Sequence, residues 1–269
     1  MMKIFKRAFL FLAAGLMLGA CEKNAIPEVT EPVQEGGAYV KFFFQVEGAP
    51  RANFYLDSKK VTAVAPTTTS NIVLGNAYGS VYPSNAYAMV PSGTFNMSAI
   101  DTVAGKGTAD VLASTSVNLA ANKHYSAYLA GTPTSYEVFM VEDNLPPADY
   151  TKIWWRFMNT MADMPFAVDA YAVRSAVAAT ETKPAEPVQV YELGKGLAFK
   201  QHGPYVELKP GTYTYKVFPA GTEYDPATSK SYIQQSFSVT TLGRVYTTQI
   251  RGAYAETPKA AQIDYWRER

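Results

Sequence analysis

The chain has 269 residues, of which 48% are hydrophobic and 13% aromatic, a composition typical of a folded globular protein rather than a disordered one. Its 24 basic and 23 acidic residues nearly balance, and beyond residue 7 they form no basic run, which argues against nucleic acid as a partner. Its one cysteine excludes a disulfide framework, so the fold must depend on a hydrophobic core.

The first twenty residues are typical of a secretory signal peptide. A basic start at residues 1–7 is followed by an uncharged apolar run at residues 8–20, which is shorter than the roughly 20 residues of a membrane-spanning helix. The run ends in Leu-Gly-Ala-Cys, which resembles the lipobox of bacterial lipoproteins, where small residues flank the cleaved bond and the cysteine thiol takes a diacylglyceryl group. This pattern predicts cleavage before Cys21 and lipid attachment at that residue. An ordinary signal peptide with a chance cysteine is the alternative.

A lipid on Cys21 predicts a membrane partner and an outer-membrane lipoprotein, on the cell surface or on the periplasmic face. Each buried methylene contributes about 0.8 kcal/mol, so two or three acyl chains would make a lasting anchor. Residues 21–37 are predicted to form a flexible lipidated tether, because they are rich in Glu and Pro and contain no aromatic residue. At roughly 3.1–3.5 Å per residue the tether would span up to about 50 Å. The Glu-Lys-Asn after the cysteine is only a partial match to the acidic export signals of surface lipoproteins, so both locations stay open.

From residue 38 onward, hydrophobic residues recur with a period of two, as in β-strands. In the first run one face carries Val40, Phe42, Phe44 and Val46, and the other carries Lys41, Phe43, Gln45 and Glu47. Runs at residues 94–99 and 124–129 repeat the pattern, and Gly, Pro, Asn and Ser lie between such runs. No segment after the signal has a long helical period. Many short strands with frequent turn signals predict an all-β sandwich or barrel.

The strand pattern occurs twice. The landmarks that recur in the same order are residues 40–43 and 155–158, residues 90–95 and 208–213, and residues 122–125 and 243–246, the last pair closing at Gly131 and Gly252. They predict two tandem immunoglobulin-like or transthyretin-like antiparallel β-sandwiches, at residues 38–145 and 151–269, after a signal peptide at residues 1–20 and the tether. A polar segment with paired prolines joins them. Gly93 and Gly211 are expected to supply a positive φ that turns the chain into a core strand.

Four motifs of the second copy point to a family. They are Arg-Phe-Met-Asn at residues 156–159, Met-Pro-Phe-Ala-Val-Asp-Ala-Tyr at 164–171, Lys-Pro-Gly-Thr-Tyr at 209–213 and Gly-Arg-Val-Tyr at 243–246. In this order they resemble an uncharacterised family of extracytoplasmic β-sandwich domains, often found as tandem copies in lipoproteins of the Bacteroidetes type. The resemblance covers residues 38–252 and fits the first copy less well, where Lys41, Asn53 and His124 replace typical residues. It implies a fold and a location but no activity, because the family has no known function. Tandem-sandwich fimbrial subunits are similar in architecture only.

No pattern in the sequence predicts a catalytic, cofactor-binding or metal-ligating residue, so we expect a protein without cofactor that is not an enzyme. His124 and His202 are expected on a strand surface and in a turn. The Gly-Lys-Gly-Thr at residues 105–108 lacks the spacing of a phosphate loop and is interpreted as a hairpin tip. Asp169 could be a surface ligand, but an aspartate more commonly accepts hydrogen bonds from turn amides, here beside Pro165. A carboxylate pair that meets only in space, as in glycosidases, stays open.

Three residues are candidates for contacts or modification. Tyr39 and Trp154 occupy aligned positions at the start of the first strand of each copy, beside Lys41 and Arg156. As exposed aromatics they could stack on sugar rings or pack against a partner, and the alternative is burial at the interface between the copies or at the end of a sandwich. Thr102 lies in Asp-Thr-Val, which resembles a short O-glycosylation acceptor used by these bacteria.

These features favour a non-catalytic envelope module that binds a partner or belongs to a surface assembly. Besides the membrane, the expected partner is a glycan or another envelope protein. One alternative is a glycan-directed hydrolase, which would need a concave site with convergent polar groups and perturbed carboxylates. The other is a fimbrial-type structural subunit that polymerises by strand addition.

Overall fold

Every regular element in the described part of the chain is a β-strand. The computed structural model describes residues 36–64, 75–102, 110–182, 184–225, 228–257 and 260–269. The predicted signal peptide, Cys21, nearly all of the tether and the motif at residues 105–108 lie outside these ranges. Within them the chain forms no helix that could span a membrane. The prediction of an all-β fold of the sandwich type is confirmed.

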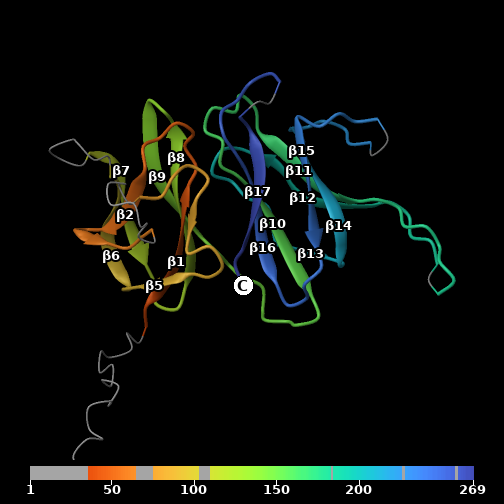
Figure 1. Ribbon diagram of the computed structural model, residues 1–269, viewed down its shortest axis with the longest axis horizontal. Coiled ribbons are helices and arrows are strands. Elements are labelled where there is room, and N and C mark those ends of the chain that lie inside the picture. The colour runs from red at the N-terminus through yellow and green to blue at the C-terminus, as the bar shows by residue number, and fades with distance from the viewer. Residues whose placement is uncertain (1–35, 65–74, 103–109, 183, 226–227, 258–259) are drawn as a thin grey trace, which may run out of the picture. The chain divides into compact units, whose positions relative to one another are not determined.

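The first half, residues 36–142, contains two sheets (Figure 1). Sheet A has the strand order β4-β1-β8-β9, with β5 also paired to β1, and sheet B has the order β3-β2-β6-β7. Their bounds are β1 (Ala38–Phe44), β2 (Ala52–Leu56), β3 (Lys59–Lys60), β4 (Val81–Tyr82), β5 (Ala88–Val90), β6 (Gly93–Asp101), β7 (Val111–Leu119), β8 (His124–Thr132) and β9 (Ser135–Glu142).

The second half, residues 153–269, also contains two sheets. Sheet C has the order β13-β10-β16-β17, and sheet D has the order β12-β11-β14-β15. Their bounds are β10 (Ile153–Asn159), β11 (Val168–Arg174), β12 (Gln189–Leu197), β13 (Val206–Leu208), β14 (Gly211–Pro219), β15 (Ile233–Val239), β16 (Val245–Arg251) and β17 (Gln262–Arg267).

One pair of strands in each half runs in parallel. These pairs are β1 with β8 and β10 with β16, whereas the other paired strands in the described sheets are antiparallel. The sheets therefore differ in this respect from the antiparallel sandwiches predicted. The chain passes through the opposite sheet between the two strands of each pair, and such a crossover lets them run in the same direction.

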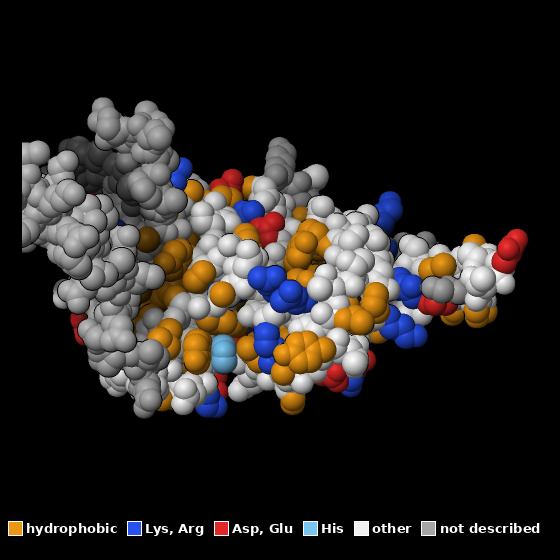
Figure 2. Space-filling view, turned by 60° about the horizontal axis from the view of Figure 1, so that its bottom comes forward, with side chains coloured by type: hydrophobic (Ala, Val, Ile, Leu, Met, Phe, Trp, Pro, Cys, Tyr) orange, Lys and Arg blue, Asp and Glu red, His pale blue; other side chains and the backbone are white. Residues whose placement is uncertain are grey.

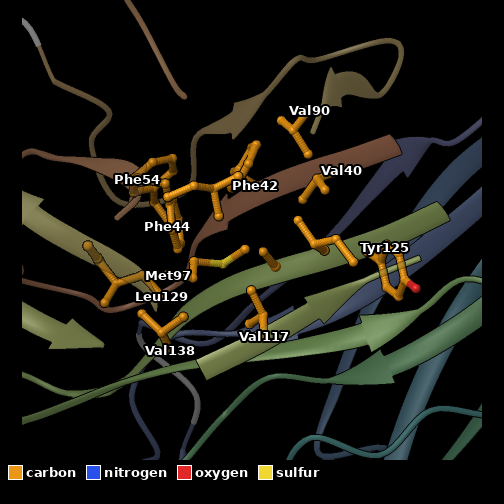
Figure 3. Close-up of a cluster of buried hydrophobic side chains, with 14 of the residues drawn as sticks. Val40, Phe42, Phe44, Phe54, Val90, Met97, Val117, Tyr125, Leu129 and Val138 are labelled. Atoms are coloured by element: carbon orange, nitrogen blue, oxygen red, sulfur yellow. The ribbon is translucent and has the colours of Figure 1, made fainter. Parts of the chain in front are cut away.

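Each half has a hydrophobic core between its two sheets. In the first half, Val40, Phe42 and Phe44 of β1 point into a cluster with side chains of β2, β6 and β8 (Figure 3). This is the face that the period of two predicted for the first strand. In the second half, Trp155 of β10 is fully buried, and its ring stacks on Tyr215 with 4.9 Å between centroids. Aromatic packing of this kind adds stability beyond the area buried.

Glycines shape the turns at equivalent places. Gly93 has the predicted positive φ, +139°, but Gly211 does not have one. A Cβ on Gly211 would lie 2.6 Å from Nε of Arg174, so the missing side chain makes room for this arginine instead. Gly131 and Gly252 have φ values of +111° and +113°. A Cβ on either would lie 2.1 or 2.3 Å from a carbonyl oxygen across the turn, which excludes any larger residue without a backbone shift.

Candidate functional site: the charged layer between the halves

Both faces of β1 and of β10 are buried. Opposite the core, β1 carries Lys41 and Phe43, and β10 carries Arg156 and Met158; each is 1% exposed or less. Phe43 and Met158 belong to one hydrophobic cluster together with Tyr128 of β8. Sheet A of the first half therefore contacts sheet C of the second, and the two halves lie in one unit, Gly36–Arg269.

Arg156 is the centre of a layer of charged side chains in this interface, which we call the charged layer. Its Nη2 lies 2.6 Å from Oδ1 of Asp143 and 2.8 Å from Oε1 of Glu268, and the three side chains are 1% exposed or less. Its Nε donates to Oγ1 of Thr247 at 3.0 Å, and its guanidinium lies 4.8 Å from the ring centroid of Tyr205. Glu268 is 112 residues along the chain from Arg156, so the fold rather than a local motif brings them together.

Hydroxyl groups supply further hydrogen bonds to the two carboxylates. Oδ2 of Asp143 accepts one from Ser126 at 2.7 Å and one from Tyr87 at 3.0 Å. Glu268 accepts one from Thr247 at 2.6 Å and one from the tyrosine that covers Arg156. These donors matter because a buried carboxylate without partners costs several kcal/mol.

Lys41 adds a second cation from the first half. Its Nζ donates to the backbone carbonyl of Arg267 and lies 5.2 Å from the ring centroid of Tyr87. Burial lowers the pKa of Lys41 to about 8, against the attraction of Glu268 and Asp143. The charged layer thus contains two basic and two acidic side chains, whose formal charges cancel.

The pKa values of Glu268, Arg156 and the two tyrosines of the layer are also shifted. It raises the pKa of Glu268, and the charge of Arg156 opposes this shift. Burial disfavours the charge on Arg156, but Glu268 and Asp143 outweigh it and hold the pKa of Arg156 well above its ordinary value. Burial raises the pKa values of Tyr87 and Tyr205, so both phenols stay protonated and able to donate to the carboxylates.

This arrangement joins the two halves and presents no reactive group to solvent. A pair of carboxylates does meet in space, as Asp143 and Glu268, but both are sealed from solvent and bonded to the same guanidinium. A general acid or base must come within hydrogen-bond reach of its substrate, which burial prevents here. In the part of the chain that the structure describes, no cluster of three or more His, Cys, Asp or Glu could hold a metal ion.

The sequence contains one signal for this layer that was not among the predictions above. Lys41 and Arg156 occupy equivalent positions on β1 and β10, with apolar neighbours on both sides. Lys and Arg are almost never fully buried unless they are paired. A long cation at a repeated position within two apolar strands therefore indicates a partner layer on the second face of each strand. Asp143 carried no such signal, because it lies in the polar segment with paired prolines, residues 142–149, that was predicted to join the two copies.

Tyr39 and Trp154, the predicted contact residues, share a strand face with Lys41 and Arg156, and both are partly buried rather than exposed. Tyr39 stacks on His124 with 4.8 Å between ring centroids, so His124 is also more covered than predicted. Burial lowers the pKa of this histidine. Trp154 lies beneath a lysine ammonium, 5.5 Å from its ring centroid. The partial burial of both rings agrees better with the alternative, burial at the interface between the copies or at the end of a sandwich, than with a pair of freely exposed aromatics.

Two hollows open near the interface. One of about 380 Å³ is lined by Lys123, His124, Glu142, residues 143–147 and Arg269. Lys123 and Glu142 form an ion pair at 2.8 Å, so part of its charge is already neutralised. The other, of about 530 Å³, lies between residues of the first half and Trp266 of the second.

On the face drawn in Figure 2, Lys and Arg side chains lie among hydrophobic ones, beside a histidine. The volumes of the two hollows fall within the range of about 300–1,000 Å³ that is usual for sites of small ligands.

The remaining candidates have local partners. Asp169 is buried and accepts the backbone N–H of Gly196 at 2.7 Å and of Gly221 at 3.0 Å. Its role as an acceptor for backbone amides is confirmed, although these amides belong to Gly196 and Gly221 and not to residues next to Pro165 in the sequence. His202 is exposed, and its ring lies 2.8 Å from the carbonyl of the next residue. The hydroxyl of Thr102 donates to a backbone carbonyl at 3.0 Å, and the third residue of its predicted acceptor motif lies outside the described ranges.

A comparison with protein families finds a match over most of the first half and the start of the second. Residues 38–171 match DUF4397, a domain of unknown function. The match includes every strand of the first half and ends within β11. The expected resemblance to a family of unknown function is thereby confirmed over these residues. Most of the second half, where the motifs predicted the better fit, lies outside the match. A search of curated proteins finds no match.

Three solved structures are similar at low sequence identity. The Bacillus anthracis TIE protein is 13% identical with a TM-score of 0.22; the match covers 82% of this chain, which spans 35% of that one. A "putative cell adhesion protein" from Bacteroides ovatus is 11% identical with a TM-score of 0.26, covering 87% of this chain and 99% of that one. Another from Bacteroides fragilis is 6% identical with a TM-score of 0.22, covering 87% and 98%. Likenesses at these TM-scores are too weak to assign a fold or a function.

Proposed function

We propose that this chain is a lipid-anchored protein of the outer membrane whose two halves serve as one non-catalytic binding or assembly module. The observation that carries the proposal is the burial of the charged layer between the two halves. Lys41, Asp143, Arg156 and Glu268 form one cluster of charged side chains, and all four are buried where the halves meet. The charged side chains of this cluster, which are of the kinds that act in catalysis, instead contribute to the contact between the halves.

Export and anchoring are supported by the basic start, the short apolar run and the Leu-Gly-Ala-Cys that ends at Cys21. A tether of about 16 residues after the lipid would leave the two halves free to reach a glycan or another envelope protein. The hollows beside His124 and Trp266 are the places where such a partner could be held.

Membrane attachment is tested by producing the full precursor in a bacterial host that is fed an alkyne-labelled fatty acid. The proposal predicts a labelled chain in the membrane fraction. Cys21→Ser should lose the label and the membrane attachment together. An unlabelled wild-type chain in the soluble fraction would overturn the proposal. Protease treatment of intact cells then distinguishes the cell surface, where the chain is cut, from the periplasmic face, where it is protected.

The enzymatic alternative is tested separately. We expect no turnover when the mature chain is incubated with polysaccharides and peptides from the cell envelope. Turnover that is lost in Glu268→Gln or Asp143→Asn, while the variant still folds, would show that the buried carboxylates become accessible and act on substrate. That result would replace the binding module by a hydrolase. A glycan array and co-purification from membranes would identify the bound partner.

A further inference from the structure

Two long strands with uncharged edges lie at corresponding ends of sheets B and D. β7 is the last strand of sheet B and β15 the last of sheet D. They are 9 and 7 residues long, and neither contains Lys, Arg, Asp, Glu or Pro. The backbone of an edge strand can pair with a further strand, and natural proteins usually prevent this with short edges, charges or proline.

The other edge strands in the described sheets carry such protection. Their charged residues are Glu137 and Glu142 in β9, Glu192 and Lys195 in β12, and Asp264 and Arg267 in β17. The strands β3, β4, β5 and β13 are only two or three residues long. Among the described edges, β7 and β15 therefore stand out by combining length with the absence of charge.

The backbone of β7 points outward at alternate residues. On β6, the N–H and the carbonyl of Asn96 both bond to Asp57, on the side away from β7. Ser116 lies opposite Asn96, so its own N–H and carbonyl turn away from β6 toward the outer edge. The same alternation applies to Ser114 and Asn118, and the side chains of all three are exposed. The irregularity of the β6–β7 ladder lies before this row, at the start of β7.

β15 presents a matching row. The carbonyl of Val217 on β14 bonds toward β15, so the residues one step out of phase turn their backbone away. Ser236, opposite Thr214, is one of these, together with Gln234 and Ser238. Ser236 and Thr214 have hydroxyl oxygens 3.0 Å apart, as expected where opposite residues share no backbone bonds and their side chains approach most closely. All three residues of the row are exposed.

We propose that β7 of one molecule pairs with β15 of a second copy of this chain, so that molecules join head to tail. Each edge offers three uncharged hydrogen-bonding side chains, at the same two-residue spacing, beside outward-facing backbone groups. The two rows therefore match in length, and no like charges oppose their pairing. Because the two edges are different surfaces, the contact is heterologous and can continue from molecule to molecule. This inference rests on the proposed role in assembly and names the partner as another copy.

The test uses the mature chain with Cys21→Ser, so that no lipid holds molecules together, and follows its mass by sedimentation as the concentration rises. We expect dimers and larger species for this chain. Ser116→Lys and Ser236→Lys each place a charge on one of the two edges, and each should leave only monomers. Thr134→Lys adds the same charge to an exposed turn residue between β8 and β9, which belongs to neither edge, and should assemble unchanged.

Mixing the two edge variants gives the sharpest result. Ser116→Lys keeps an open β15 and Ser236→Lys keeps an open β7, so the mixture should form dimers and nothing larger. A starting chain that stays monomeric at every concentration would overturn the proposal, and so would assembly by either edge variant alone.

A proline variant guards against effects of the lysine on folding. Ser116→Pro removes an N–H that does not bond to β6, so the sheet keeps its own ladder while the outer edge loses a donor. With an unchanged circular dichroism spectrum, this variant should also be monomeric; assembly as before would contradict the proposal. None of these outcomes concerns the lipid on Cys21, so failure here and failure of the anchor can be told apart.

Discussion

Replacing Arg156 by methionine tests the charged layer most sharply. Methionine is close to arginine in length but has no charge and no hydrogen-bond donor. The variant loses ion pairs to Asp143 and Glu268 and the hydrogen bond to Thr247. The formal charge of the layer then changes from zero to −1, with Lys41 left as the only cation facing two carboxylates.

The structure allows the size of the effect to be worked out. Removing one partner from a buried ion pair typically costs about 3–5 kcal/mol, because the other charge is left uncompensated. Each carboxylate keeps two hydroxyl donors here, from Ser126 and Tyr87 for Asp143 and from Thr247 and a tyrosine for Glu268. We therefore expect a loss in the free energy of unfolding near the lower end of that range, about 3 kcal/mol.

The assay is urea unfolding followed by tryptophan fluorescence. Lys123→Met is the matched control, because Lys123 pairs with Glu142 at 2.8 Å, the same distance that separates Arg156 from Glu268, but at an exposed site. The control should unfold like the wild type. Adding Glu268→Gln to Arg156→Met leaves one cation and one carboxylate, so the double variant should recover part of the loss, about 1–2 kcal/mol.

Two results would refute the reasoning. One is an Arg156→Met chain that is as stable as the Lys123→Met control. The other is a double variant that is less stable than Arg156→Met, because removal of the second charge would then bring no relief. Either result would mean that the layer contributes shape rather than charge compensation to the contact between the halves.

Three further predictions concern stability. Burial lowers the pKa of Lys41 to about 8, so between pH 8 and the ordinary value of 10.5 the unfolded chain binds more protons than the folded chain. The free energy of unfolding should therefore gain a contribution that rises with pH over this range, and Lys41→Met should remove it. Plots of the free energy of unfolding in urea against pH that run parallel for the two chains would contradict this. Gly131→Ala, whose Cβ would lie 2.1 Å from the carbonyl oxygen of Ser135, should lower the melting temperature more than Gly196→Ala, where nothing lies within 4 Å and the positive φ alone costs about 1–2 kcal/mol. Asp169→Ala removes the acceptor of two backbone amides and should cost about 2–4 kcal/mol in urea unfolding, with Asp169→Asn costing less; equal losses in the two variants would be against the hydrogen-bonding role.

Alternation in the sequence located strands and their faces, but not what covers each face. The run that begins at Val40 correctly predicted one face of β1 as core. The other face, with Lys41 and Phe43, is covered by a second sheet, and a period of two looks the same whether solvent or protein lies on that side. This is why exposure of Tyr39 and Trp154 and their burial at an interface were both left open from the sequence, and the structure has both residues partly buried.

For the two turn glycines and for the partners of Arg156, too, local sequence predicted one part of the structure and not the other. Gly93 has the positive φ that its turn motif predicted, whereas Gly211, in the matching motif, leaves room for an arginine from a neighbouring strand. The two motifs are similar but not identical, with proline two residues before Gly93 and directly before Gly211, and the arginine beside Gly211 is a neighbour in space that neither motif indicates. Of the partners of Arg156, Asp143 is set by the packing of sheet A on sheet C, whereas Glu268 follows β17 in the same half and is brought close by the fold of that half; no local pattern encodes either contact.

The intact mass of the chain isolated from the envelope of its own cells tests the central claim most directly. The account predicts the mass of residues 21–269 increased by a diacylglyceryl group and an amide-linked acyl chain on Cys21, recovered with the membranes. A chain of unmodified mass that still begins at Met1, or a cleaved chain without lipid in the soluble fraction, would contradict it.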